Sequence, residues 1–190
     1  MTSPTPGDPS IPLLGSANSA ERERAAADLF ARGRELIAPI LASWLQDADL
    51  RASFGSATPR ITVGIAAPPD LFEKIRAAHG NPRLAAVPPD QDAVEFELHF
   101  AGGVQLDFLT TNSPRGSGAI ARYLEKFGAG IQQVEIDVAC VDRASEILRS
   151  RFQLAPLYPA TRAGADGTRV NFFLAARPDG RKVLIELVEK

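Results

Sequence analysis

One order of elements occurs twice along this chain, and it constrains the fold more than any other feature. From residue 61 the apolar pattern predicts a strand, a helix and three more strands, and from residue 131 it predicts the same order again. A curved half-sheet of this size cannot cover its own concave face. The repeat therefore predicts an α+β fold in which two tandem βαβββ modules form a cupped, barrel-like mixed sheet.

The expected elements follow from strand alternation, helical spacing and turn residues. The first copy is predicted to have strands at 61–66, 84–87, 94–100 and 104–111, and a helix at 68–78. The second copy is predicted to have strands at 131–138, 154–158, 169–175 and 182–188, and a helix at 142–151. Turns rich in glycine, proline or aspartate separate several of these elements.

The whole chain is predicted to divide into three segments. Residues 1–19 are rich in Pro, Ser, Gly and Thr, which predicts a flexible tail. Residues 20–58 carry apolar residues at helical spacing, and Gly33 and Pro39 predict a helical arm of one broken helix or two shorter ones. The remaining domain, 59–190, is predicted to comprise module one at 59–111, a connector helix segment at 112–129 and module two at 130–190.

Composition narrows the classes of partner. The chain has 190 residues and a formal net charge of −2, so it lacks the basic excess typical of nucleic-acid binding. Its one cysteine, Cys140, cannot form an internal disulfide or a thiolate cluster for zinc. The start of the chain does not resemble a signal peptide, and no apolar run reaches membrane-spanning length. We therefore expect a soluble, cytoplasmic protein with no nucleic-acid or membrane partner.

Strand alternation places acidic residues together. In the strand 94–100, Glu95, Glu97 and His99 share one face, while the apolar residues share the other. The turn at 101–103 places Glu97 across from Asp107, so this pair should bind a cation, share a proton or turn to solvent. Glu186 likewise interrupts an apolar run. An ordinary sheet with one wet face would explain the same pattern.

Four motifs resemble one known family. They are Ile-Ala-Arg-Tyr-Leu-Glu-Lys-Phe at 120–127, Gly-Ile-Gln-Gln-Val at 130–134, Gly-Thr-Arg-Val-Asn-Phe at 167–172 and Val-Leu-Ile-Glu-Leu-Val at 183–188. Together with the repeated order of elements, they resemble the vicinal oxygen chelate superfamily, which includes glyoxalases, bleomycin-resistance proteins and dioxygenases. The resemblance is closest to the methylmalonyl-CoA epimerases and extends from Ile61 to Glu189.

The resemblance implies roles for particular residues. The family's metal-ligand positions fall on Thr62, Asp107, Gln133 and Glu186, and two of them, Thr62 and Gln133, replace histidines. The metal site is therefore expected to be altered or lost, with Asp107, Glu186 and Gln133 as its remaining ligands. These residues would suit a divalent cation such as Mg²⁺ or Ca²⁺, and His99 could join a rearranged site.

The resemblance also implies a function. Glu95 and Glu186 match the catalytic carboxylates of an isomerase or lyase that abstracts a proton next to a carbonyl. Gln133, Asn171, Arg169 and His99 are the expected substrate-binding residues, and Arg60 and Arg115 are further candidates for phosphate contacts. The alternatives are a non-catalytic small-molecule binding protein of the bleomycin-resistance type and a degenerate scaffold. The expected partner is a small molecule, any cofactor would be a divalent cation, and the fold allows a homodimer.

Overall fold

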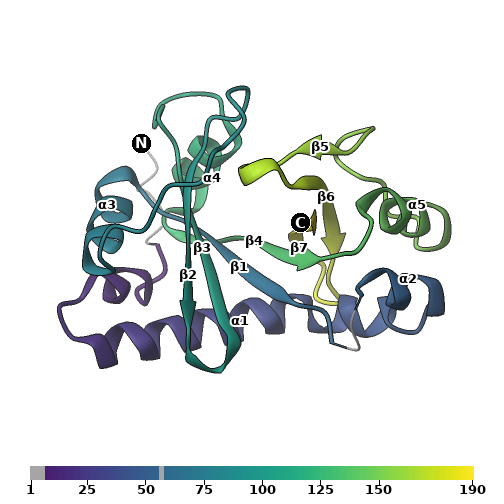
Figure 1. The fold of residues 1–190 in the computed structure, drawn as a ribbon, viewed down its shortest axis with the longest axis horizontal. Helices are drawn as coiled ribbons and strands as arrows, with labels where there is room; N and C mark the ends of the chain where they lie inside the picture. Colours follow the sequence, from purple (N-terminus) through teal and green to yellow (C-terminus); the bar gives the residue numbers. More distant parts are fainter. Residues whose placement is uncertain (1–6, 56–57) are drawn as a thin grey trace. The chain divides into compact units, whose positions relative to one another are not determined.

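The computed structural model describes residues 7–55 and 58–190 (Figure 1). Residues 1–6 and 56–57, which belong to the predicted tail and arm, lie outside this range. The chain forms two compact units, each an assembly of helices and a sheet. Unit 1 comprises Met1–Arg32 and Val63–Gln132, and unit 2 comprises Gly33–Thr62 and Gln133–Lys190. Among the helices described, none is both long and apolar enough for a membrane span.

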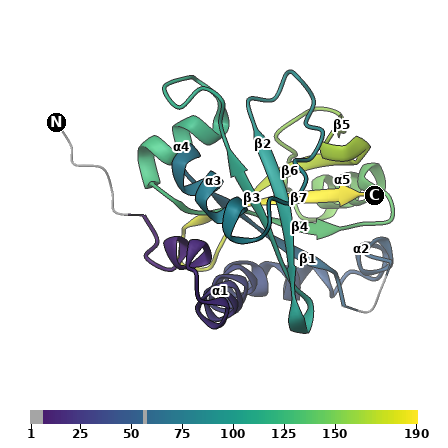
Figure 2. The ribbon, with the colours of Figure 1, turned by 60° about the vertical axis from the view of Figure 1, so that its left-hand side comes forward.

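The sheet of unit 1 has the strand order β2-β3-β1 (Figure 2). These strands are β1 (Ile61–Ala66), β2 (Val94–Phe100) and β3 (Val104–Thr110), close to their predicted bounds. β1 is parallel to β3, and β2 is antiparallel to β3. The strand predicted at 84–87 is absent from the described structure, which shows a backbone bond from Ala85 N–H to Glu95 O at 2.9 Å. Prolines on both sides of this run cannot donate to a ladder, which explains the correction.

Helices of unit 1 pack on this sheet. Helix α3 (Pro69–Ala78) begins with a proline at its first position and contributes Phe72 to the core. The Phe72 ring lies 4.8 Å from Phe96 of β2, and Phe96 stacks on Phe108 of β3 at 5.1 Å between centroids. Helix α4 (Ala119–Phe127) packs through Ile120 against the carboxyl ends of β1 and β3. Helix α3 thus covers the face of β2 and β3 that carries Phe96 and Phe108, whereas Leu109, which packs with Ile120 of α4, lies on the opposite face.

The N-terminal segment of unit 1 contains a short buried helix within the expected tail. The 3-10 helix η1 (Ile11–Gly15) buries Ile11 and Leu14 completely. The His79 ring Nε2, at the end of α3, lies 3.0 Å from Leu14 O and hydrogen-bonds it. Two apolar residues three positions apart form one face of such a helix, so this short pattern overcomes the polar composition around it.

The helical arm contributes two helices. Helix α1 (Ser19–Trp44) continues through Gly33 and Pro39, which were expected to interrupt it. Pro39 is exposed, so solvent can satisfy the carbonyl that loses its backbone partner. Helix α2 (Ala48–Ser53) follows in unit 2, and Asp47 caps it by accepting a hydrogen bond from Leu50 N–H at 2.9 Å.

The sheet of unit 2 has the order β4-β7-β6-β5. Its strands are β4 (Gly130–Asp137), β5 (Arg162–Ala163), β6 (Arg169–Ala176) and β7 (Lys182–Glu189). β4 is parallel to β7, and the other pairs are antiparallel. The strand predicted at 154–158 is instead an isolated bridge between Pro156 and Phe173, and the short β5 was not predicted. Prolines at 156 and 159 limit pairing in this segment.

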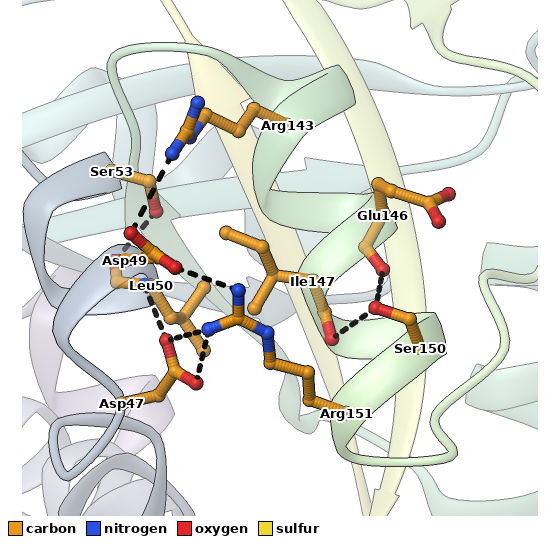
Figure 3. Close-up of polar contacts among 9 residues, drawn as sticks. All are labelled: Asp47, Asp49, Leu50, Ser53, Arg143, Glu146, Ile147, Ser150 and Arg151. Carbon is orange, nitrogen blue, oxygen red and sulfur yellow. Dashed lines mark hydrogen bonds and ion pairs between the residues drawn. The ribbon is translucent and has the colours of Figure 1, made fainter.

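Helix α5 (Val141–Arg151) packs on β6 and β7 through its apolar face. Figure 3 shows how its polar side meets α2. Arg151 donates to both carboxylate oxygens of Asp47 at 2.7 and 3.0 Å and to Asp49 at 2.6 Å. Arg143 lies 3.7 Å from Asp49. We call the Asp47, Asp49, Arg143 and Arg151 group the α2–α5 ion cluster.

Candidate active site

The acidic residues of unit 1 lie on one face of β2 and β3. The register places Glu97 across from Asp107 and His99 across from Gln105, as the turn at 101–103 predicted. Asp107 is buried with 7% exposure, whereas the Glu97 side chain is 36% exposed. Glu95 lies on the same face of β2 and pairs with Leu109. Two carboxylates therefore do oppose each other in this sheet.

His99 is held by both of its ring nitrogens. Its Nε2 lies 3.3 Å from Glu97 Oε2, and its Nδ1 lies 3.0 Å from Gln105 Nε2. The side chain is 59% exposed. The local pairing of His99 with neighbours on its own sheet accounts for its position, and its expected role in substrate binding stays a prediction.

The acidic residues of unit 2 lie on β4 and β7. Gln133 Nε2 donates to Glu186 Oε2 at 2.5 Å and lies 3.4 Å from Glu135 Oε1. Glu135 and Glu186 are partners in the parallel register. Gln133 and Glu186 are 5% and 9% exposed, so this amide and this carboxylate form a buried pair. The structure thus joins two residues that are 53 positions apart in sequence.

Two of the expected substrate-binding residues lie on the other face of unit 2. Phe172 is the register partner of Glu186, so its neighbour Asn171 points to the opposite side of β6. The Asn171 side chain donates to Tyr158 O at 3.3 Å, and Arg169 pairs with Asp142 of α5 and with Glu189. Neither residue shares a face with Glu186. Strand alternation alone could not predict these faces, because the faces of β6 and β7 can be matched only when the register between the two strands is known.

The arginines considered for phosphate contacts have local partners or remain exposed. Arg60 lies 3.7 Å from Asp137 in unit 2, with 65% of its side chain exposed. Arg115 is exposed in the loop before α4. Hydrogen bonds from Arg169 to Asp142 and Glu189 raise the pKa of its guanidinium, so Arg169 stays charged within these pairs.

Sequence reasoning missed two residues beside Glu186. Glu135, the register partner of Glu186, is not among the expected site residues, and Phe172 appears only as the last residue of one motif. Phe172 also lies 5.9 Å from the Tyr158 ring, and the Arg162 guanidinium lies 4.3 Å above that ring. Phe172 on β6, one member of this aromatic pair, therefore borders the buried carboxylate of Glu186 on β7.

Comparisons with known proteins identify the family. No family model and no curated protein matches the sequence, whereas solved structures do. The methylmalonyl-CoA epimerase from Mycobacterium tuberculosis is 32% identical, with a TM-score of 0.54, and the match covers 67% of this chain and 85% of that one. The chain belongs to the methylmalonyl-CoA epimerase family. The vicinal oxygen chelate fold that the resemblance implied is thereby confirmed.

Two further epimerase structures show what related proteins bind. A variant of the Streptomyces coelicolor methylmalonyl-CoA epimerase, in complex with 2-nitronate-propionyl-CoA, is 25% identical with a TM-score of 0.54, over 70% of this chain and 97% of that one. A methylmalonyl-CoA epimerase in complex with methylmalonyl-CoA and NH4+ is 26% identical with a TM-score of 0.53, over 70% of this chain and 94% of that one. Members of the epimerase family therefore bind CoA esters.

The metal expected for an epimerase can be tested against the donor groups of unit 2. Gln133 turns its N–H donors toward the carboxylates, whereas a metal ligand must present a lone pair. The opposite amide orientation would place two oxygens 2.5 Å apart, so hydrogen bonding fixes the orientation observed. Across the described ranges there is no group of three or more His, Cys, Asp or Glu residues suited to a metal ion. As arranged, Gln133 and Glu186 do not fit a shared cation.

Thr62, the other position that replaces a family histidine, is also a poor ligand. It is 2% exposed, and its hydroxyl finds no hydrogen-bond partner within the described part of the chain. A neutral hydroxyl binds transition metals more weakly than imidazole does. The two positions at which the resemblance implies imidazole thus offer a hydroxyl and an amide.

Proposed function

We propose that this chain is an epimerase-like isomerase or lyase that removes a proton from the carbon next to the carbonyl of an acyl thioester. Family membership supports this reaction class, and the related structures hold CoA esters. The observation that carries the proposal is Glu186, a buried carboxylate held by the Gln133 amide and bordered by Phe172. A carboxylate in a fixed orientation beside apolar surface suits a general base.

In the proposed reaction, a Glu186 oxygen accepts the proton and the electron pair of the C–H bond becomes an enolate. A second acid then returns a proton to the other side of the carbon. We assign that role to Glu95, which lies on the polar face of its own sheet in unit 1. Phe172 offers an apolar contact for the acyl group, since it is the cross-strand partner of Glu186.

Solvent-deuterium exchange tests the assignment. Parent protein, Glu186→Gln and Glu95→Gln would be incubated with acyl-CoA esters in D₂O, and deuterium at the α-carbon would be followed by NMR. Each substitution should slow exchange by about 100-fold or more, because loss of a general base typically costs 10²–10⁴ in rate. The matched control is Glu146→Gln, an exposed residue of α5 paired with Arg149. Exchange that is absent from the parent, or equal in all four proteins, would reject the proposal.

A non-catalytic binding protein is the second candidate. The replacement of family histidines by Thr62 and Gln133 favours it, because a binding pocket needs no electrophile. In that case CoA esters or other small molecules would raise the melting temperature, with no exchange at the α-carbon.

We further propose a cytoplasmic homodimer, which light scattering on the purified protein and localisation of the tagged chain would test.

A further inference from the structure

We propose that Gln133 takes the place of a metal ion in this protein. Its amide N–H groups, in place of a divalent cation, hold Glu186 in position from β4. The inference rests on the proposed function only where it assigns Gln133 a positioning role for a catalytic base. The claim about metal binding stands on the geometry of unit 2 and can be tested without an activity.

The direction of the Gln133 amide supports this proposal. One nitrogen, Gln133 Nε2, carries two N–H groups and lies 2.5 Å from Glu186 and 3.4 Å from Glu135. The two carboxylates come from neighbouring strands and are register partners. A primary amide is the neutral side chain that can donate toward two acceptors from one atom. The amide therefore does here what a cation does between two carboxylates in a metal site.

Burial of Gln133 and Glu186 also supports the proposal. Gln133 and Glu186 are more than nine-tenths buried, so the donor and the acceptor lack bulk water as an alternative partner. A buried carboxylate with a lost partner is costly, which makes the amide a requirement of this arrangement. A cation placed between Gln133 and Glu186 would need the amide to rotate and this hydrogen bond to break.

The chemical consequence follows from the loss of the Lewis acid. An epimerase that activates a thioester through a metal stabilises the enolate by charge, whereas an amide-held base supplies no such charge. The reaction proposed for this chain therefore needs a carbon acid more acidic than a simple acyl thioester, such as one with a second carbonyl or a nitro group on the α-carbon. Chelators should leave its rate unchanged.

The first test measures metal binding. Full-length parent protein, Gln133→His and Gln46→His would be analysed for metal content by mass spectrometry and titrated with Co²⁺ by absorption spectroscopy. Gln133→His places an imidazole beside Glu135 and Glu186, so it should bind Co²⁺ at least about tenfold more tightly than the parent. Gln46, exposed in the same unit and bonded to Ala42 O, is the control for an added imidazole.

Two outcomes would overturn the inference. One is stoichiometric Co, Ni, Zn, Fe or Mg in the parent that disappears in Glu186→Gln. The other is a folded Gln133→His protein, checked by circular dichroism, that binds Co²⁺ no better than Gln46→His. If Gln133→His does not fold, the metal content of the parent and of Glu186→Gln decides the matter alone.

The second test separates positioning from simple packing. Gln133→Met keeps the length of the side chain and removes its N–H donors. It should lower kcat for exchange about tenfold or more with little change in KM, because the base loses its orientation while the substrate contacts remain. An unchanged kcat would reject the positioning role. A parent without exchange on any substrate would reject the proposed function, while the metal measurements would still decide the inference about Gln133.

Discussion

Asp107 and Glu186 occupy matching places in the two sheets, yet their neighbours are reversed. Asp107 lies near the middle of β3, which is parallel to β1, and Glu186 lies near the middle of β7, which is parallel to β4. Across the antiparallel pair, Asp107 faces Glu97 and Glu186 faces Phe172. Across the parallel pair, Asp107 has Gly64 and Glu186 has Glu135. Both copies therefore keep a carboxylate at this position. Its acidic neighbour lies on the antiparallel strand in unit 1 and on the parallel strand in unit 2.

This difference shows how the copies of a repeat diverge in chemistry while they keep the fold. In unit 1 the like-charge partner Glu97 is partly exposed and pairs with His99, so solvent and imidazole moderate the repulsion. In unit 2 a buried amide lies between the strands and donates to Glu186. In unit 2, the hydrogen bond from Gln133 holds the Glu186 carboxylate in one orientation.

The largest expected effect tests what the sheets have in common. Phe96→Ala in unit 1 and Phe173→Ala in unit 2 each remove a fully buried ring. Each should lower the free energy of unfolding by about 3–5 kcal/mol, because lost burial and a cavity act together. Urea denaturation followed by circular dichroism would measure both. A loss below about 1 kcal/mol in either variant would mean that the cores of the two sheets are not equivalent.

The next effect comes from exchanging the cross-strand neighbours. Phe172→Glu would give Glu186 the like-charge partner that Asp107 has, and it would remove the contact with Tyr158. The expected loss in unfolding free energy is about 2–3 kcal/mol, from opposed charges and lost apolar burial. In the reverse exchange, Glu97→Phe should stabilise unit 1 slightly. A stable Phe172→Glu protein at neutral pH would contradict this account of the reversed neighbours.

A smaller effect isolates the amide. Gln133→Met leaves Glu186 without its buried donor and should cost about 1–3 kcal/mol of unfolding free energy. The matched change in unit 1 is Gln105→Met, which removes a contact with the exposed His99 and should cost less than about 0.5 kcal/mol. Thermal unfolding of the two variants beside the parent gives both numbers. Equal losses would show that burial does not distinguish the two sites.

Much of this comparison was accessible from the sequence, and its limits have physical causes. The repeated order of elements, the opposition of Glu97 and Asp107 and the family followed from alternation and motifs. The sequence did not predict which face of the sheet Asn171 occupies. Alternation gives the relative sides of residues within one strand, but it does not give the register of β6 against β7. The resemblance implied one site for Gln133 and Glu186, but it did not predict their direct hydrogen bond, which joins two residues 53 positions apart in sequence. The predictions of strands at 84–87 and 154–158 were wrong, because prolines limit backbone pairing in both segments.

The smallest expected effects concern pH, because η1 in unit 1 and α2 in unit 2 should lose stability over different pH ranges. Burial lowers the pKa of His79 below its ordinary value of 6.5, with Arg22 acting in the same direction, although the bond to Leu14 O opposes the shift. The unfolded chain therefore binds this proton first as pH falls. The stability that His79 gives to η1 is present above about pH 6.5 and is lost as pH falls below it.

In unit 2 the sensitive group is Asp47. The hydrogen bond from Arg151, and then the one from Leu50 N–H, hold the pKa of this carboxyl below its ordinary 3.8. Its contribution is therefore present above about pH 3.8 and is lost as pH falls through the lower folded value. Acidification from about pH 7 to about pH 5 should thus speed hydrogen exchange in η1 before it affects α2.

Hydrogen–deuterium exchange by mass spectrometry, corrected for intrinsic rates, would measure both segments in one sample. His79→Gln should remove the change in η1 between these two pH values. Asp47→Asn should weaken α2 at both pH values, because the α2–α5 ion cluster loses one of its two carboxylates. Simultaneous opening of η1 and α2 in the parent would contradict the assignment. It would mean that the pH response belongs to the whole chain and not to the separate contacts of each unit.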